Sequence, residues 1–199
     1  MVRFSKVRFL VRFSNQGHTP KDVRALSLSA FETVKPFGGD VGNVRVSSYA
    51  IELDLLLSSK LKLQDAIHAL EGDLGSLLTS RELDTLGPQL DVEEEIRQGI
   101  ELFNSERYWE SHEALEYAWR KASGSNKEVL QGIILVAAAL VHLQRDESKV
   151  ALSVMQRAYH KLTGKDPAYF GIDIENLRNE LSRMISAGIP EFVKIKTNP

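Results

Sequence analysis

The stretch VLQGIILVAAALVHL, residues 129 to 143, decides the fold of the second half of this chain. Apolar side chains surround it on nearly every side, whereas a helix at a protein surface carries them on one stripe only. Its apolar run from Gly132 to Val141 is about half the length that a membrane-spanning helix needs. The stretch therefore predicts a buried central helix, over about residues 127 to 145, in an all-α bundle.

Four further helical stretches around this helix complete a predicted bundle of about five helices. The first begins at a capping box formed by Asp91 and Glu94, and Asn104 is expected to cap the second. The last ends at Gly188 and Pro190. Three of them show apolar residues three or four positions apart: Val92, Ile96, Ile100 and Phe103; Ala151, Met155, Tyr159 and Leu162; and Leu177, Leu181, Met184 and Ile185. Residues 87 to 199 are therefore predicted to form a helical bundle domain.

The first 86 residues alternate between strand and helix patterns. VRFLVRFS, residues 7 to 14, alternates apolar with basic side chains, as a half-buried strand does. One helix is predicted after the capping box of Thr19 and Asp22, and another over residues 63 to 74. Between the helices, VRVSSYAIELDLLLS is either one bulged strand or two strands joined by a tight turn near Ser47.

The segment LLTSREL adds a last strand, so residues 1 to 86 are predicted to form a small α+β domain, a ferredoxin-like sandwich. The polar face of the middle segment carries Glu52 and Asp54. Its apolar face is expected to hold Tyr49, Ile51, Leu53, Leu55 and Leu57.

The composition is that of a soluble globular protein, with 43% hydrophobic and 26% charged residues. The chain has no cysteine, which excludes disulfides, thiolate metal sites and cysteine nucleophiles. The start MVRFSKVRFL lacks the continuous apolar core of a signal peptide. We therefore expect a cytoplasmic protein without membrane insertion.

The net charge of −2 leaves no strongly basic domain, which argues against nucleic acid as the partner. Lys6, Arg8 and Arg12 lie on the polar face of the first strand, so RNA binding through the N-terminal sheet is a lesser alternative. Cross-strand ion pairs between these residues and Glu52 or Asp54 are the simpler interpretation.

The stretch YWESHEALEYAWR, residues 108 to 120, is the strongest candidate for a functional site. On a helix, Tyr108, Trp109, Leu115, Glu116 and Trp119 lie within about 60° of His112, and we expect this aromatic face to be buried. A buried histidine and carboxylate are costly unless they are paired or hydrogen-bonded.

The central helix offers partners for this pair. We expect Gln131 and His142 to face His112 and Glu116 across small alanine positions that let the two helices approach closely.

Three interpretations of this cluster remain open. As a metal site, His112 and Glu116 reach one ion with His142 as a third ligand, which would suit a metal-assisted hydrolase; however, Glu116 replaces the second histidine of the zinc signature. As an acid/base pair, Glu116 would orient a catalytic His112 without a metal. As a structural cluster, these hydrogen-bonded side chains fix the register of the helices.

The segments LFNSERYWESHEALEYAWR, LQGIILVAAALVHL and ALSVMQRAYHKL resemble the helical family catalogued as domain of unknown function 309, found in bacteria and archaea. The resemblance covers about residues 93 to 162 and implies a compact bundle around a central helix. It carries no activity, because that family has none established. The family's motif positions are occupied here by His112, Glu113, Glu116, Trp119, Arg120, Gln131 and His142.

We therefore expect a binding or protein-interaction module with a groove near His112 and Glu116, which receives a protein or small-molecule partner. No cofactor is certain, a divalent metal is the alternative, and a homodimer is compatible with the sequence. The residues expected to bind the ligand are Trp109, Glu113, Trp119, Arg120 and Gln131.

Overall fold

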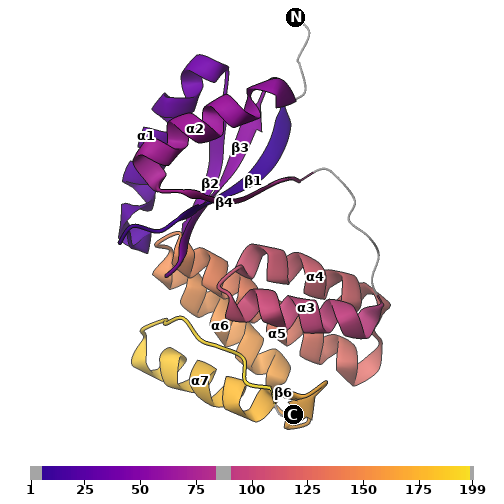
Figure 1. The fold of residues 1–199 in the computed structure, drawn as a ribbon. Coiled ribbons are helices and arrows are strands. Elements are labelled where there is room, and N and C mark those ends of the chain that lie inside the picture. The colour runs from indigo at the N-terminus through magenta and orange to yellow at the C-terminus, as the bar shows by residue number, and fades with distance from the viewer. Residues whose placement is uncertain (1–5, 84–90, 198–199) are drawn as a thin grey trace, which may run out of the picture. The chain divides into compact units, whose positions relative to one another are not determined.

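The computed structural model describes residues 6 to 83 and 91 to 197 (Figure 1). The chain divides into two compact units, one with a four-stranded sheet and two helices, the other with the helices that follow. The domain boundary expected at residues 86 and 87 lies outside the described residues.

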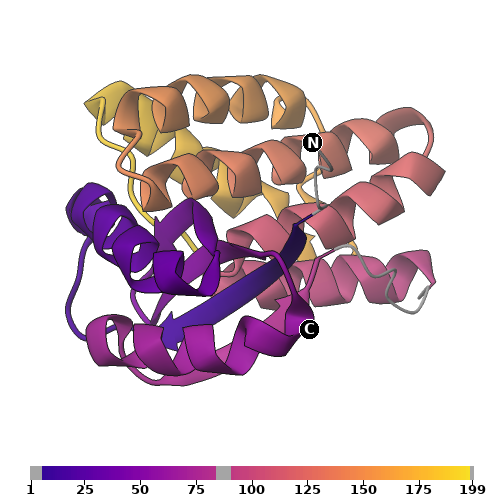
Figure 2. The same ribbon diagram turned by 90° about the horizontal axis from the view of Figure 1, so that it is seen from above.

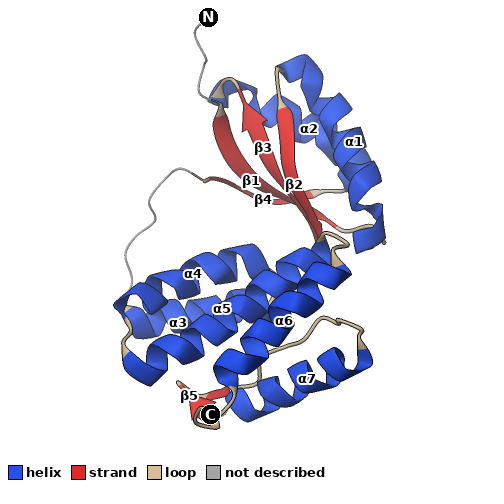
Figure 3. Ribbon diagram, turned by 180° about the vertical axis from the view of Figure 1, so that it is seen from behind, coloured by secondary structure: helices blue, strands red, loops and turns tan. Residues whose placement is uncertain are grey.

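The first unit is an antiparallel sheet with the strand order β2-β3-β1-β4. Helices α1 and α2 cover one of its faces (Figure 3). The elements are β1 (Val7–Ser14), α1 (Val23–Val34), β2 (Asp40–Val46), β3 (Ala50–Leu57), α2 (Leu63–Leu74) and β4 (Leu77–Glu82). The middle segment is thus two strands joined by a tight turn, in which the Ser47 amide donates to the Ala50 carbonyl oxygen.

Apolar side chains at alternate positions of the strands form much of the core of this unit. Phe9, Val11 and Phe13 of β1 pack with Ile51, Leu53, Leu55 and Leu57 of β3 against apolar residues of both helices. Tyr49 does not join them, contrary to our expectation. It lies in the turn before β3, where strand alternation does not apply, and its side chain is exposed.

The second unit contains α3 (Val92–Asn104), α4 (Tyr108–Lys121), α5 (Gly124–Gln144), α6 (Ser148–Leu162) and α7 (Ile174–Ala187). The described residues hold seven α-helices in total. This total exceeds the five predicted for the bundle because α1 and α2 belong to the α+β part. The Asp91 carboxylate accepts a hydrogen bond from the Glu94 amide at 2.9 Å, as expected of the residue that caps α3.

Helix α5 supplies much of the core of the helical unit. Its buried side chains contact residues of α3, α4, α6 and α7, and they include Leu130, Ile133, Val136, Ala137 and Leu140. By length and composition alone this helix could cross a membrane, and half of its most apolar window is buried within the protein. Its apolar character is accounted for by the core that it fills.

A short hairpin before α7 was not expected from the sequence. Strands β5 (Ala168–Tyr169) and β6 (Ile172–Asp173) form it, and Ile172 also pairs with Thr197 near the C-terminus. Asn104 lies at the end of α3 and holds the same C-terminal segment, exchanging two hydrogen bonds of 2.8 Å with the backbone of Ile195. The expectation that Asn104 caps α4 is therefore wrong, because its amide is occupied by this distant strand-like segment.

Candidate functional site

Helix α4 buries only part of the face that the sequence suggested. Tyr108, Leu115 and Ala118 are buried in the core, whereas His112 and Glu116 are only partly covered. The physical reason is the packing against α3, where a methyl group added to Gly99 would lie 2.7 Å from the Leu115 side chain. Close approach of the two backbones at Gly99 brings Leu115 into the core and leaves His112 and Glu116 partly exposed.

The site residues expected on α4 contact neighbours on α4 itself or near the start of α5. The His112 ring stacks on Trp109 with centroids 6.2 Å apart and an interplanar angle of 4°. Glu116 accepts a hydrogen bond from Arg120, one turn further along α4, at 3.2 Å. The Trp119 ring lies under the Lys127 ammonium at 4.4 Å, a cation–π contact, and packs against the core.

The two residues of α5 that were expected to face them lie elsewhere. His142 has its Nδ1 2.5 Å from a Glu147 carboxylate oxygen, beyond the end of α5. Gln131 lines a groove toward α6. Within the described parts of the chain, no hydrogen bond or ion pair joins either residue to His112 or Glu116. A direct hydrogen bond between these pairs is therefore not made, and a contact through water stays a prediction.

Metal binding at this cluster stays a prediction. The hydrolase alternative needs His112, Glu116 and His142 around one ion. Across residues 6 to 83 and 91 to 197, no three histidine, aspartate or glutamate side chains are grouped closely enough to hold one. Glu113 is exposed on α4 and contributes to no such group.

Gln131 lies in a groove of the helical unit that is lined mostly by polar side chains. Helices α5 and α6 lie side by side (Figure 2), and the groove between them has a volume of about 520 Å³. This volume is within the range of ligand sites in proteins. Its walls are formed by Glu128, Gln131, Leu135, Arg157, His160, Lys161, Thr163 and Lys165.

Positive charge predominates in this groove. Arg157, Lys161 and Lys165 face a single carboxylate, that of Glu128. Lys165 forms an ion pair with Glu128. The hydrogen bond from Lys165, together with the charges of Lys165 and Lys161, lowers the pKa of the Glu128 carboxyl. In the described part of the chain, Arg157 and Lys161 make no hydrogen bond or ion pair, so two cations remain available.

The sequence did not lead us to predict these basic residues as a site, although their spacing on one helix could have indicated it. Arg157 and Lys161 are four residues apart and therefore share a face of α6. Nothing in the sequence placed that face opposite Gln131, because the pairing of α5 with α6 depends on the tertiary packing.

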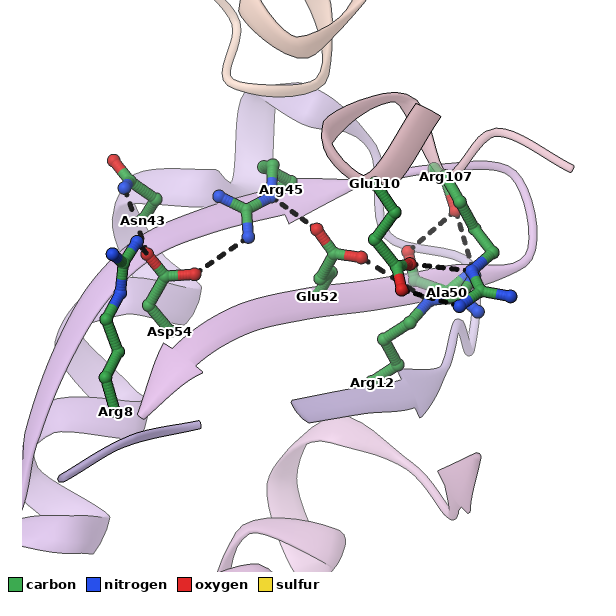
Figure 4. Close-up of polar contacts among 10 residues, drawn as sticks. Arg8, Arg12, Asn43, Arg45, Ala50, Glu52, Asp54, Arg107 and Glu110 are labelled. Carbon is green, nitrogen blue, oxygen red and sulfur yellow. Dashed lines mark hydrogen bonds and ion pairs between the residues drawn. The ribbon is translucent and has the colours of Figure 1, made fainter. Parts of the chain in front are cut away.

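The polar face of the sheet carries an ion-pair network across three strands (Figure 4). Arg45 of β2 donates to Glu52 at 2.5 Å and to Asp54 at 2.9 Å, both on β3. From β1, Arg8 donates to Asp54 at 2.6 Å, and Arg12 lies 3.5 Å from Glu52. The cross-strand ion pairing that we expected is thus present. RNA binding by the same basic residues stays a prediction.

In this network, Asp54 accepts side-chain hydrogen bonds from Arg8, Asn43 and Arg45. Burial acts to raise its pKa, but the charge of Arg45 and the hydrogen bonds from Arg8, Arg45 and Asn43 outweigh that effect. The pKa of Asp54 is therefore held below its ordinary value. A carboxylate bound in this way stabilises the folded sheet as long as it stays ionised.

Comparison with known proteins places the helical part in one family. Residues 96–154 match the family described as domain of unknown function (DUF309). The chain is also similar to a conserved hypothetical protein from Thermus thermophilus, known from a crystal structure. That similarity has 33% sequence identity and a TM-score of 0.40, and covers 45% of this chain and 94% of the other. No curated protein matches the sequence significantly.

Proposed function

Because the helical part of this chain belongs to the DUF309 family, whose name assigns no activity, we propose a function from the side chains of the helical part. The helical part is a binding module that holds an anionic group in the α5–α6 groove. The observation that carries this proposal is the excess of cations around Gln131. The architecture that we propose for the module is a ferredoxin-like domain, residues 1 to 86, followed by a helical bundle domain, residues 87 to 199.

The groove offers the donors that a carboxylate or a phosphate needs. The Arg157 guanidinium presents paired N–H groups in a fixed plane, which suits two oxygens of one anion. Lys161 adds a point charge from the next turn of α6, and the Gln131 amide adds a neutral donor from α5. The groove thus draws its donors from two helices.

The first test is a titration with inorganic phosphate and, separately, with acetate, followed by the backbone amide NMR signals of Gln131 and Lys161. We expect saturable shifts with both anions, and about tenfold weaker binding in Arg157→Gln because a charge-assisted hydrogen-bond pair is lost. Arg24→Gln is the matched control, since Arg24 is an exposed arginine on α1. Equal binding by Arg157→Gln and the wild type would refute the proposal.

Glu128→Gln gives a second test with the opposite sign. The substitution keeps the shape of the side chain but removes the carboxylate that pairs with Lys165. The affinity for phosphate should rise about threefold, because the variant lacks the carboxylate that repels the anion and leaves the Lys165 ammonium without that ion pair. Weaker binding by this variant would show that the anion does not enter the groove.

A further inference from the structure

A second cleft in the helical unit differs from the α5–α6 groove in composition, because its floor is apolar and its rim acidic. It is formed by α3, the β5–β6 hairpin and the C-terminal segment, and it has a volume of about 520 Å³. Ile96, Ile100 and Ile172 form the floor, and all three are buried in the core of the helical unit. The cleft can therefore receive an apolar group without any rearrangement of the core.

Phe170 stands at the edge of this cleft in an unfavourable backbone conformation. It occupies the first position of the two-residue turn between β5 and β6, with φ of 46°, and Gly171 follows with φ of 74°. Turns of this kind favour asparagine or glycine, and a bulky residue there is disfavoured. The ring is nevertheless 51% exposed, and Tyr169 supports it edge-on with centroids 4.8 Å apart.

A strained, exposed aromatic beside a cleft is typical of a residue kept for contact with a ligand. Nothing in the core requires the Phe170 ring at this position, because half of its surface is open to solvent. The ring offers a flat apolar face, and an aromatic ligand could stack on it above the isoleucine floor.

The charges around the cleft indicate which polar group the ligand carries at the end away from its aromatic ring. Arg97 is occupied, since it forms ion pairs with both Glu94 and Glu101. Glu93 also lines the cleft, and it makes no hydrogen bond or ion pair with any residue that the structure describes. The Asn104 amide exchanges two hydrogen bonds with the Ile195 backbone and carries no charge. Among the described residues that line the cleft, the Glu93 carboxylate is thus the charged group without an ion pair. It lies in the first turn of α3, where the helix dipole favours a negative charge.

We propose that this cleft binds an arylalkylamine, with the aromatic ring between Phe170 and the isoleucine floor and the ammonium group at Glu93. Charge complementarity identifies the occupant as a cation, because the lining has two carboxylates and one guanidinium. An anion would meet Glu93 and Glu101, and an uncharged apolar molecule would leave Glu93 without a partner. This site is separate from the anion groove and does not depend on it.

The experiment compares three indole compounds whose short side chains are cationic, neutral and anionic: tryptamine, tryptophol and indole-3-acetate. Each is titrated into the full-length protein, and the backbone amide NMR signals of Ile100 and Gly171 are followed. We expect saturable shifts with tryptamine, at least tenfold weaker binding of tryptophol, and no binding of indole-3-acetate in this cleft.

Two variants test the assigned roles. Glu93→Gln should bind tryptamine about as weakly as the wild type binds tryptophol. Phe170→Asn should weaken all binding while leaving the turn intact, since asparagine accepts a positive φ; its thermal unfolding verifies the fold. Arg157→Gln, in the other groove, should bind tryptamine as the wild type does. Equal affinity for tryptamine and tryptophol, or unchanged binding by Glu93→Gln, would overturn the proposal.

Discussion

Gly132 shows how single atoms control the packing of the helical unit. A Cβ atom at this position of α5 would lie 2.5 Å from Cδ2 of Leu162, a buried residue at the end of α6. We expect Gly132→Ala to lower the free energy of unfolding by about 1 to 3 kcal/mol, the usual cost of overpacking a core. Urea unfolding of the full chain measures this change.

Gly72 is the matched control, because it also lies within a helix but a Cβ atom added there would meet nothing within 4 Å. There alanine should raise the stability by about 0.5 to 1 kcal/mol through helix propensity. If both substitutions stabilise the protein, then the close approach of α5 and α6 is not a constraint.

Asp54 makes the stability of the sheet depend on pH. Its folded-state pKa lies below the ordinary value of 3.8, so its stabilising contribution is complete above that value. The contribution is lost as the pH falls below 3.8 and through the folded-state pKa, because protonation then removes the charge that Arg8 and Arg45 bind.

We therefore expect Asp54→Asn to be less stable than the wild type at neutral pH, with a smaller loss of stability on acidification. Chemical unfolding at a series of pH values, followed by far-UV circular dichroism, measures both slopes. Identical slopes for the two proteins would mean that Asp54 is not bound more tightly in the folded state than in the unfolded one.

At the scale of elements, the start of α3 depends on one side chain. Asp91 accepts the amide hydrogen of Glu94, which would otherwise have no partner within the helix. Asp91→Ala should cost about 1 kcal/mol, whereas Asp91→Ser, which keeps a capping oxygen, should cost much less. Thermal unfolding distinguishes the two, and equal losses would show that the cap contributes through its charge alone.

Helix periodicity explains which elements could be predicted. Residues 129 to 143 are apolar on all sides, and this pattern correctly identified α5 as a core helix. For α4 the same reasoning correctly placed Tyr108 and Leu115 on the buried face, but His112 and Glu116 of that face are only partly covered. The close contact of Leu115 with Gly99 of α3 sets the rotation of the helix, and the spacing within α4 does not report it. The β5–β6 hairpin could not be found, since strands of two residues show no period.

The candidate sites were the hardest part to predict. The anion groove joins side chains of α5, α6 and the loop that follows α6, and the second cleft joins α3 to a hairpin and the C-terminal segment. Only Gln131 of the expected site residues lies in either one. Sequence spacing reports neighbours on one helix, but it carries no information about which helices pack together.

At the scale of the whole molecule, the chain has two separate hydrophobic cores. In the part of the chain that the structure describes, the buried residues of one core lie between Phe9 and Leu74, and those of the other lie between Ile96 and Ile195. We expect residues 88 to 199, expressed alone, to unfold in one cooperative transition. Both tryptophans belong to α4, so tryptophan fluorescence measures the unfolding of this unit. A broad, non-cooperative change would contradict this expectation.

The separation of the two cores also bears on how the protein is made. Because the described residues of the first core, including the partly buried Leu77 that packs against it, all precede α3, the ribosome has released that core before it finishes the helices that follow. The sheet can then fold while α5 and α6 are still being synthesised. The exposed apolar surface of the nascent chain is thereby limited to one unit at a time, which lowers the risk that strands of β1 to β4 pair with neighbouring chains.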